Sequence, residues 1–458
     1  MRAIKNIHAP VNRLPPEILS RVLLYRDREQ DIVVATHVCQ YWRSTLISTP
    51  SLWTFIQFQS AGDIDRAVAY LERSKALTVD ISMELDSSQD LDVPRYFAPH
   101  MSRTRSFAIS GRFDAFTVSS LLTNPVPSLE HLKLHTEVSP VGTLDNFLAR
   151  QAPLLPSAIF DGICPALQSP FPLPSLTVLS LRLLRNMGPL TISSLLRFCS
   201  SFPQLQELNT GIYCEIIHDV SSDQVVSLDS LVTLQYTDHA AVGPFIPFLK
   251  LPRLSLLSVF SPWLYNLADF LPHSGHTLHS GATTLSHCHD HSTQRVELSG
   301  RGVKTSFLRV DDNDTDATSA EWFSDENSIP FGQIEDLDLL CYRISADFPI
   351  HLFENLTTIR VTQRFERVCG GVLQLLHPCP EAGIPCPFLR VIEYTFSSSP
   401  ESHMRFLISL AEEREQAGYR LRLVHVLGWQ IAPDLEGELR SHVGELCVGK
   451  PPGNQDYC

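Results

Sequence analysis

Apolar residues recur along most of the chain with one spacing: an apolar residue, two others, an apolar residue, one other and a third apolar residue. Clear copies of this unit begin at Leu129, Leu176, Leu231, Leu254, Ile334, Leu356, Leu389 and Leu421. Weaker copies begin at Thr104, Leu205 and Thr305. Alternation over the last four residues of each copy predicts a short β-strand.

The distance between copies predicts what connects the strands. Most neighbouring copies begin about 23–29 residues apart, which leaves roughly 20 residues to return along a helix or a loop. We expect helical returns over 191–202, 365–376 and 402–417. Two intervals are longer, so we expect the Pro-rich stretch 153–174 to loop out and a decayed copy to lie near Leu278. The pattern predicts an α/β repeat array.

The first 56 residues have a different pattern, which indicates a small all-helical unit. Proline in a first turn, with Glu17 near the positive end of the helix dipole, predicts a helix that starts within 14–17. Asp31 is a candidate N-cap for a second helix, in which Val34, Val38 and Trp42 lie four residues apart. Because so short a unit buries little apolar surface alone, its apolar stripes predict a partner.

Composition and charge exclude several classes of protein. The chain has 36 basic and 50 acidic residues, a net charge of −14, and so lacks the basic excess that nucleic-acid binding requires. No apolar run approaches the ~18 residues that cross a bilayer, and the first residues lack a signal-peptide core. Eleven cysteines without a Cys-x-x-Cys pair favour reduced thiols. We expect a cytoplasmic or nuclear protein without a membrane partner.

Three N-terminal motifs in order carry a family resemblance. The sequences Leu14-Pro15-Pro16-Glu17-Ile18-Leu19, Val38-Cys39-Gln40-Tyr41-Trp42-Arg43 and Pro50-Ser51-Leu52-Trp53 together resemble an F-box, and the repeats resemble the leucine-rich arrays of fungal F-box proteins. The resemblance implies an α+β fold: a small all-α F-box followed by an α/β leucine-rich-repeat solenoid with a curved parallel sheet and helices outside. We expect the F-box at 8–57, a connecting helix and first irregular repeat at 58–100, the solenoid at 101–430 and a C-terminal tail at 431–458.

The same resemblance implies a function without catalysis. Such a protein is a substrate-recognition adaptor of a cullin-type (SCF) ubiquitin ligase, which binds a Skp-type adaptor through the F-box and a target through the repeats. The alternative is a repeat scaffold that binds partners without any ligase. The resemblance assigns the adaptor surface to Leu14, Pro15, Ile18, Leu19, Val22, Val38, Trp42 and Trp53. Val38, Trp42 and Trp53 could be shared between that surface and the domain core.

Residues between the apolar strand positions are the candidates for target binding. Strand side chains alternate between faces, so these residues should line one continuous surface outside the core. This surface mixes both charge signs, which suits a protein partner better than a polyanion. The candidates are His131, Lys133, Arg182, Gln235, Asp338, Arg360 and Glu393.

Two further segments suggest metal chemistry, and neither has the spacing of a metal site. Six histidines and Cys288 fall within 273–291, yet no cysteine pair accompanies them, so we interpret this segment as an exposed loop rather than a zinc site. The acidic run 311–316 resembles a calcium loop but has Ala317 and Phe323 where that loop needs Gly and Glu. No nucleotide-binding or hydrolase motif occurs. We expect no metal, cofactor or enzyme activity.

Overall fold

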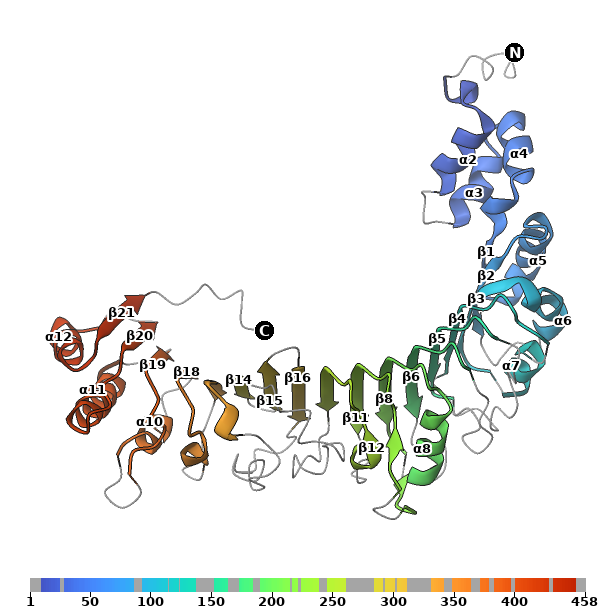
Figure 1. Cartoon of the computed structure of the whole chain (residues 1–458). Coiled ribbons are helices and arrows are strands. Elements are labelled where there is room, and N and C mark those ends of the chain that lie inside the picture. The colour runs from blue at the N-terminus through green and yellow to red at the C-terminus, as the bar shows by residue number, and fades with distance from the viewer. Residues whose placement is uncertain are drawn as a thin grey trace. The chain divides into compact units, whose positions relative to one another are not determined.

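The computed structural model describes the chain over residues 10–24, 29–85, 93–113, 115–122, 124–136, 152–163, 173–183, 190–214, 216–220, 224–238, 245–260, 284–290, 293–300, 303–310, 331–341, 348–363, 371–378, 383–396, 400–427 and 431–449. Two compact units divide the chain, residues 1–214 and residues 215–458. N-terminal helices are followed by α/β structure in which most strands pair in parallel (Figure 1).

The first unit opens with the predicted helical segment. Its elements are η1 (Pro10–Arg13), α2 (Pro16–Leu24), α3 (Glu29–Thr36), α4 (Gln40–Ile47) and η2 (Pro50–Trp53). Helix α2 starts with proline and has Glu17 in its first turn, as predicted. The second predicted helix is instead two helices, because the backbone of Cys39 is extended and Arg43 Nε donates to the carbonyl of Thr36 at the end of α3, 3.0 Å away. Val38 therefore lies in a turn and does not continue a helical stripe.

The rest of the first unit is a parallel sheet with helices beside it (Figure 1). Its elements are β1 (Phe55–Phe58), η3 (Ala61–Asp63), α5 (Ile64–Arg73), β2 (Val79–Leu85), α6 (Val93–Phe97), η4 (Ala98–Arg103), β3 (Thr104–Gly111), α7 (Ala115–Leu122), β4 (His131–His135), β5 (Ser157–Asp161), β6 (Val178–Leu183), β7 (Leu190–Thr191), α8 (Ile192–Ser200) and β8 (Glu207–Ile212). Strands β1 to β6 pair in chain order, and β8 pairs with β6. Helix α8 lies within the return predicted over 191–202.

Strand β5 corrects the expectation that 153–174 loops out. It pairs in parallel with β4 on one side and β6 on the other. Leu155, Ala158 and Phe160 repeat the apolar spacing of the other copies, and all three are buried. Gly162 directly follows the strand; its φ is +78°, and a Cβ atom there would collide with the carbonyl oxygen of Thr136. No larger residue fits this turn.

The second unit continues the same alternation of strands and returns. Its elements are β9 (Ile216–Ile217), β10 (Val226–Ser227), β11 (Thr233–Asp238), η5 (Ile246–Phe248), β12 (Leu249–Lys250), β13 (Leu256–Phe260), β14 (Thr284–Asp290), β15 (Thr293–Gly300), β16 (Val303–Val310), η8 (Phe331–Gln333), β17 (Asp336–Cys341), η9 (Ile350–Leu352), β18 (Thr358–Gln363), α10 (Gly371–Leu375), β19 (Val391–Phe396), α11 (Pro400–Gln416), β20 (Leu423–Leu427), α12 (Pro433–His442) and β21 (Glu445–Gly449). Every apolar position of the eight clear repeat copies is buried in the two units.

The histidine-containing segment is the second correction, because 284–290 is a strand and not an exposed loop. Strand β14 pairs antiparallel with β15 and parallel with β17. Strand β15 also pairs antiparallel with β16, and β16 pairs parallel with β13. These antiparallel pairs make the sheet mixed at this point. The expected decayed copy near Leu278, the acidic run 311–316 and the histidines at 273, 276, 279 and 291 lie outside the described residues.

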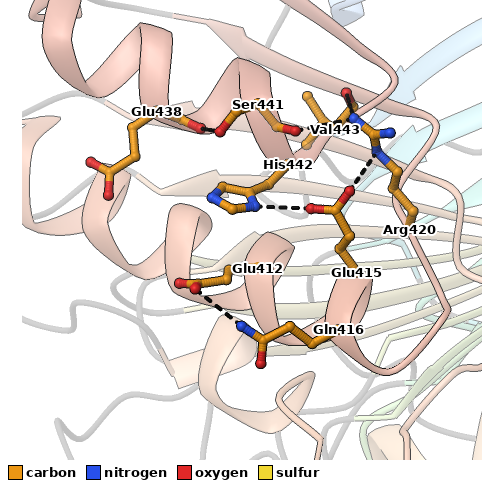
Figure 2. A network of polar contacts seen from close by, with 8 residues as sticks. All are labelled: Glu412, Glu415, Gln416, Arg420, Glu438, Ser441, His442 and Val443. Carbon is orange, nitrogen blue, oxygen red and sulfur yellow. Dashed lines mark hydrogen bonds and ion pairs between the residues drawn. The ribbon is translucent and has the colours of Figure 1, made fainter.

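Residues 431–449 are the third correction, because they form α12 and β21 where we expected a tail. Strand β21 extends the sheet by pairing in parallel with β20, and α12 contacts α11. Figure 2 shows Glu415 between Arg420 and His442: its Oε1 lies 3.3 Å from Arg420 Nε, and its Oε2 accepts from His442 Nδ1 at 2.9 Å. Arg420 Nη2 also donates to the carbonyls of Ser441 and Val443. The signal in the sequence was one more copy of the spacing, at Val443, Leu446 and Val448.

We predict that deleting 284–290 lowers the stability of the second unit. Deleting an exposed loop would change the stability little. The deletion removes a strand that is paired on both sides, and each lost hydrogen bond costs about 0.5–1.5 kcal/mol. Urea unfolding followed by circular dichroism should show a loss of several kcal/mol. The double variant His287→Thr, His289→Thr keeps the strand backbone and serves as the control. An unchanged midpoint for the deletion would contradict the strand assignment.

A buried histidine gives this unit a predictable acid sensitivity. Burial lowers the pKa of His403, whose Nδ1 lies 2.9 Å from the hydroxyl of Tyr394. The unfolded chain therefore binds a proton more readily than the native protein, so stability is present above about pH 6.5 and is lost as pH falls. The free energy of unfolding should be measured between pH 8 and pH 5. Its dependence on pH should be weaker in His403→Gln than in the wild type, by up to about 1.4 kcal/mol per pH unit. Identical slopes in both proteins would contradict this.

Candidate functional site

The start of α2 is fixed against α4 by side chains from the predicted motifs. Trp42 Nε1 donates to Asn12 Oδ1 at 2.7 Å, and Tyr41 Oη donates to the carbonyl oxygen of Leu14 at 2.8 Å. Leu14 and Trp42 are half-buried, and Pro15 is exposed. Because Leu14 and Pro15 directly precede α2, these two hydrogen bonds determine how that end of the helix is presented.

Two of the candidate adaptor-binding residues belong to the core. Leu19 is buried, and the side chain of Trp53 has no exposed surface. Trp53 Nε1 donates to the carbonyl oxygen of Leu46 at 2.9 Å, its ring meets that of Tyr70 edge to face, and Arg73 lies over it at 4.5 Å from the centroid. These contacts join the helical segment to α5. Neither side chain is available to a partner in this structure.

Three other candidates are apolar side chains in solvent. Ile18 is 43% exposed, Val22 51% and Val38 54%. Ile18 and Val22 are four residues apart and share one face of α2, whereas Val38 lies in the turn before α4. Five exposed apolar residues of the same segment were not among the candidates: Val11, Leu24, Val34, Ile47 and Phe55. So much exposed apolar surface on about fifty residues indicates an interaction site.

The register of the second unit brings three target-binding candidates side by side. Asp338 of β17 pairs with Arg360 of β18, and Arg360 pairs with Glu393 of β19. His425 of β20 is next in this row, and was not among the candidates. Gln235 of β11 is exposed and lies in the same row, but β13, β16, β15 and β14 separate it from Asp338.

The guanidinium of Arg360 contacts carboxylates on both neighbouring strands, β17 and β19. Arg360 Nε lies 3.2 Å from Glu393 Oε2, and Arg360 Nη2 lies 4.0 Å from Asp336 Oδ1. Burial raises the pKa of Asp338; the charge of Glu393 raises it further, and that of Arg360 opposes both. Asp338 is therefore held in a position that disfavours its charged form, which is a frequent property of functional acids.

In the first unit, β5 separates the candidates on β4 from the candidate on β6. His131 and Lys133 are exposed on β4, and Arg182 is half exposed on β6. Asp161 on β5 lies between the two strands, and its Oδ2 accepts from His135 Nδ1 at 2.9 Å and lies 3.6 Å from Arg182 Nη1. Asp161 was missed because its strand was expected to be a loop. Over the part of the chain that the structure describes, no group of three or more His, Cys, Asp or Glu residues is arranged to hold a metal ion.

Comparison with known families identifies the helical segment. The F-box-like family matches residues 11–59, which contain α2, α3, α4, η2 and the first strand. F-box domains in general bind Skp-type adaptors of cullin ligases, and F-box proteins are in general non-catalytic substrate adaptors. No curated protein matches the chain. None of the helices in the described ranges has both the length and the apolar character needed to cross a membrane.

We predict that Asp338→Asn stabilises the protein at neutral pH. A carboxyl group whose pKa is raised by folding opposes stability once it ionises, so the gain should be present at pH 7 and vanish below about pH 3, where both states are protonated. Thermal unfolding at both pH values provides the measurement. Asp336→Asn is the matched control and should not stabilise, because it removes a carboxylate that contacts Arg360. A lower melting temperature for Asp338→Asn at pH 7 would contradict the prediction.

Proposed function

We propose that this protein is the substrate-recognition adaptor of an SCF-type cullin ubiquitin ligase. The observation that carries the proposal is the coincidence of the F-box-like match over 11–59 with a set of apolar side chains in solvent. The adaptor surface would centre on Ile18 and Val22, with Leu14, Pro15, Val38 and Trp42 around it. Apolar burial with an aromatic anchor is how such interfaces obtain affinity.

The remainder of the chain would hold the target. We propose that the parallel strands form a leucine-rich-repeat solenoid whose sheet face binds the protein to be ubiquitinated, with bounds close to 101–430 and a continuation through β21. The regular apolar spacing, its burial and the parallel register support this proposal. Such a protein accelerates ubiquitin transfer by proximity and contributes no reacting group. His131, Lys133, Arg182, Gln235, Asp338, Arg360 and Glu393 would contact the target.

Adaptor binding is tested with the double variant Ile18→Ala, Val22→Ala. Each buried methylene contributes about 0.8 kcal/mol, so losing five carbon atoms should weaken binding at least about a hundredfold. About half of each residue is exposed, so the free protein should keep most of its stability. Binding of a purified Skp-type adaptor to the full chain is measured by calorimetry, and unfolding by circular dichroism.

Phe116→Ala is the matched control, because Phe116 is 76% exposed on α7 and lies outside the F-box-like match. It should leave adaptor affinity unchanged. A folded double variant that binds as well as the wild type would contradict the ligase assignment. Failure of the wild-type chain to bind any Skp-type adaptor, together with capture of other partners, would favour the scaffold function.

A further inference from the structure

Four side chains near the carboxyl ends of three neighbouring strands of the first unit form a charged cluster. Lys133 and His135 come from β4, Asp161 from β5 and Arg182 from β6, and we call them the Arg182 cluster. His135, Asp161 and Arg182 are direct partners in register, so they share a face and follow one another across three strands. Backbone hydrogen bonds continue past the strand ends, from Thr136 N to the carbonyl of Asp161 and from Gly162 N to that of Arg182, both at 2.8 Å.

The cluster has more positive than negative groups. A single oxygen, Asp161 Oδ2, serves both His135 Nδ1 at 2.9 Å and Arg182 Nη1 at 3.6 Å. The longer distance is an ion pair without a hydrogen bond, so Arg182 retains donors that are directed elsewhere. Lys133 is exposed, and its partners in register are Ala108 and Ile159, which carry no charge. The carboxylate of Asp161 therefore pairs with one permanent cation and an imidazole, and Lys133 adds a second cation on the same face of β4 without a charged partner in register.

The guanidinium of Arg182 is held in place while half of its side chain stays in solvent. It lies 5.2 Å from the centre of the Tyr213 ring, and the side chain is 50% exposed. Gly211 is the register partner of Arg182 on β8, and a Cβ atom there would lie 3.4 Å from Arg182 Cγ and 3.5 Å from Tyr213 Cε2. The stem of Arg182 thus lies over the strand where a side chain is missing. A positioned guanidinium loses little entropy when it binds a carboxylate.

An ion pair elsewhere on the same sheet, between β3 and β2, shows the contrast. Arg105 Nε donates to Asp80 Oδ1 at 3.0 Å, and a second nitrogen of Arg105 contacts the other oxygen of the same carboxylate. This pair is bidentate, and both oxygens of one carboxylate are engaged by one guanidinium. The Arg182 cluster is open by comparison, because its carboxylate is shared and its guanidinium is turned toward an aromatic ring.

We propose that the Arg182 cluster binds the side-chain carboxylate of an acidic, extended segment of a partner protein. Charge complementarity carries the proposal, because Lys133 and Arg182 provide hydrogen-bond donors for a carboxylate of the partner. The protein as a whole has a net charge of −14, so this local excess of cations contrasts with the rest of the chain. A nucleic acid would meet too few cations here. That the partner is a ubiquitination target rests on the proposed function, whereas the binding of an acidic segment does not.

The test uses the full chain and two labelled peptides, one of alternating Glu and Ser and one of alternating Gln and Ser. Fluorescence anisotropy should show binding of the Glu peptide alone, weakened by salt. Arg182→Gln should reduce affinity about tenfold or more, as expected for the loss of a charge-assisted hydrogen bond. Asp161→Asn should increase affinity, because it removes the competing carboxylate. Arg197→Gln is the matched control, since it removes the same charge from an exposed position on α8.

Three outcomes would overturn the proposal. These are equal affinity for the two peptides, no binding of the Glu peptide even at low ionic strength, and equal losses in Arg182→Gln and Arg197→Gln. Unfolding curves of every variant establish that each is folded, and Tyr213→Leu supplies a second variant that disturbs Arg182 without removing charge. Binding of a Skp-type adaptor is measured on the same proteins. Absence of adaptor binding would contradict the proposed function, whereas the peptide measurements alone test the Arg182 cluster.

Discussion

Parallel pairing of strands in register is the constraint on which the rest of this structure depends. Side chains alternate between the two faces of a strand, so a shift of one residue would exchange the buried set for the exposed one. In the observed register, Leu132 and Leu134 are buried and Lys133 between them is exposed. Likewise Ile359 and Val361 are buried, whereas Arg360 between them lies on the opposite face of the strand and contacts Glu393. The polar chemistry of the sheet follows from where its apolar residues are buried.

The repeat spacing predicts the strands wherever three sizeable apolar residues occur together. It failed at β5 because Ala158 occupies a middle position between prolines, and a small residue carries little weight in a hydrophobic pattern. It failed at β14 and β15 because histidines and other polar residues dominate 284–295, and strand pairing depends on partners that are distant in sequence. At the C-terminus the copy that begins at Val443 is present in the sequence, but it was not recognised as a repeat and the segment was expected to be a tail.

Individual roles were harder to predict than elements. The N-terminal motifs identified the segment correctly, yet they did not separate Trp53, which is wholly buried, from Val22, which is half exposed. In helices of eight or nine residues, two neighbouring apolar side chains can point to the core and to solvent, and only packing decides which. Polar contacts were likewise beyond the sequence: nothing in the chain order of His135, Asp161 and Arg182 shows that one carboxylate oxygen contacts both the imidazole and the guanidinium.

The burial of Trp53 makes the N-terminal segment less portable than its length suggests. The F-box-like match ends at residue 59, but the ring of Trp53 is covered by Tyr70 and Arg73, and the matched residues include β1, which pairs with β2. Cutting the chain at the end of the match would uncover an indole and leave the edge of one strand unpaired. Exchange of this segment between chains would have to carry α5 and a compatible β2 as well. The N-terminal helices and the first strands of the sheet are therefore packed as one structural unit, so changes in one constrain changes in the other.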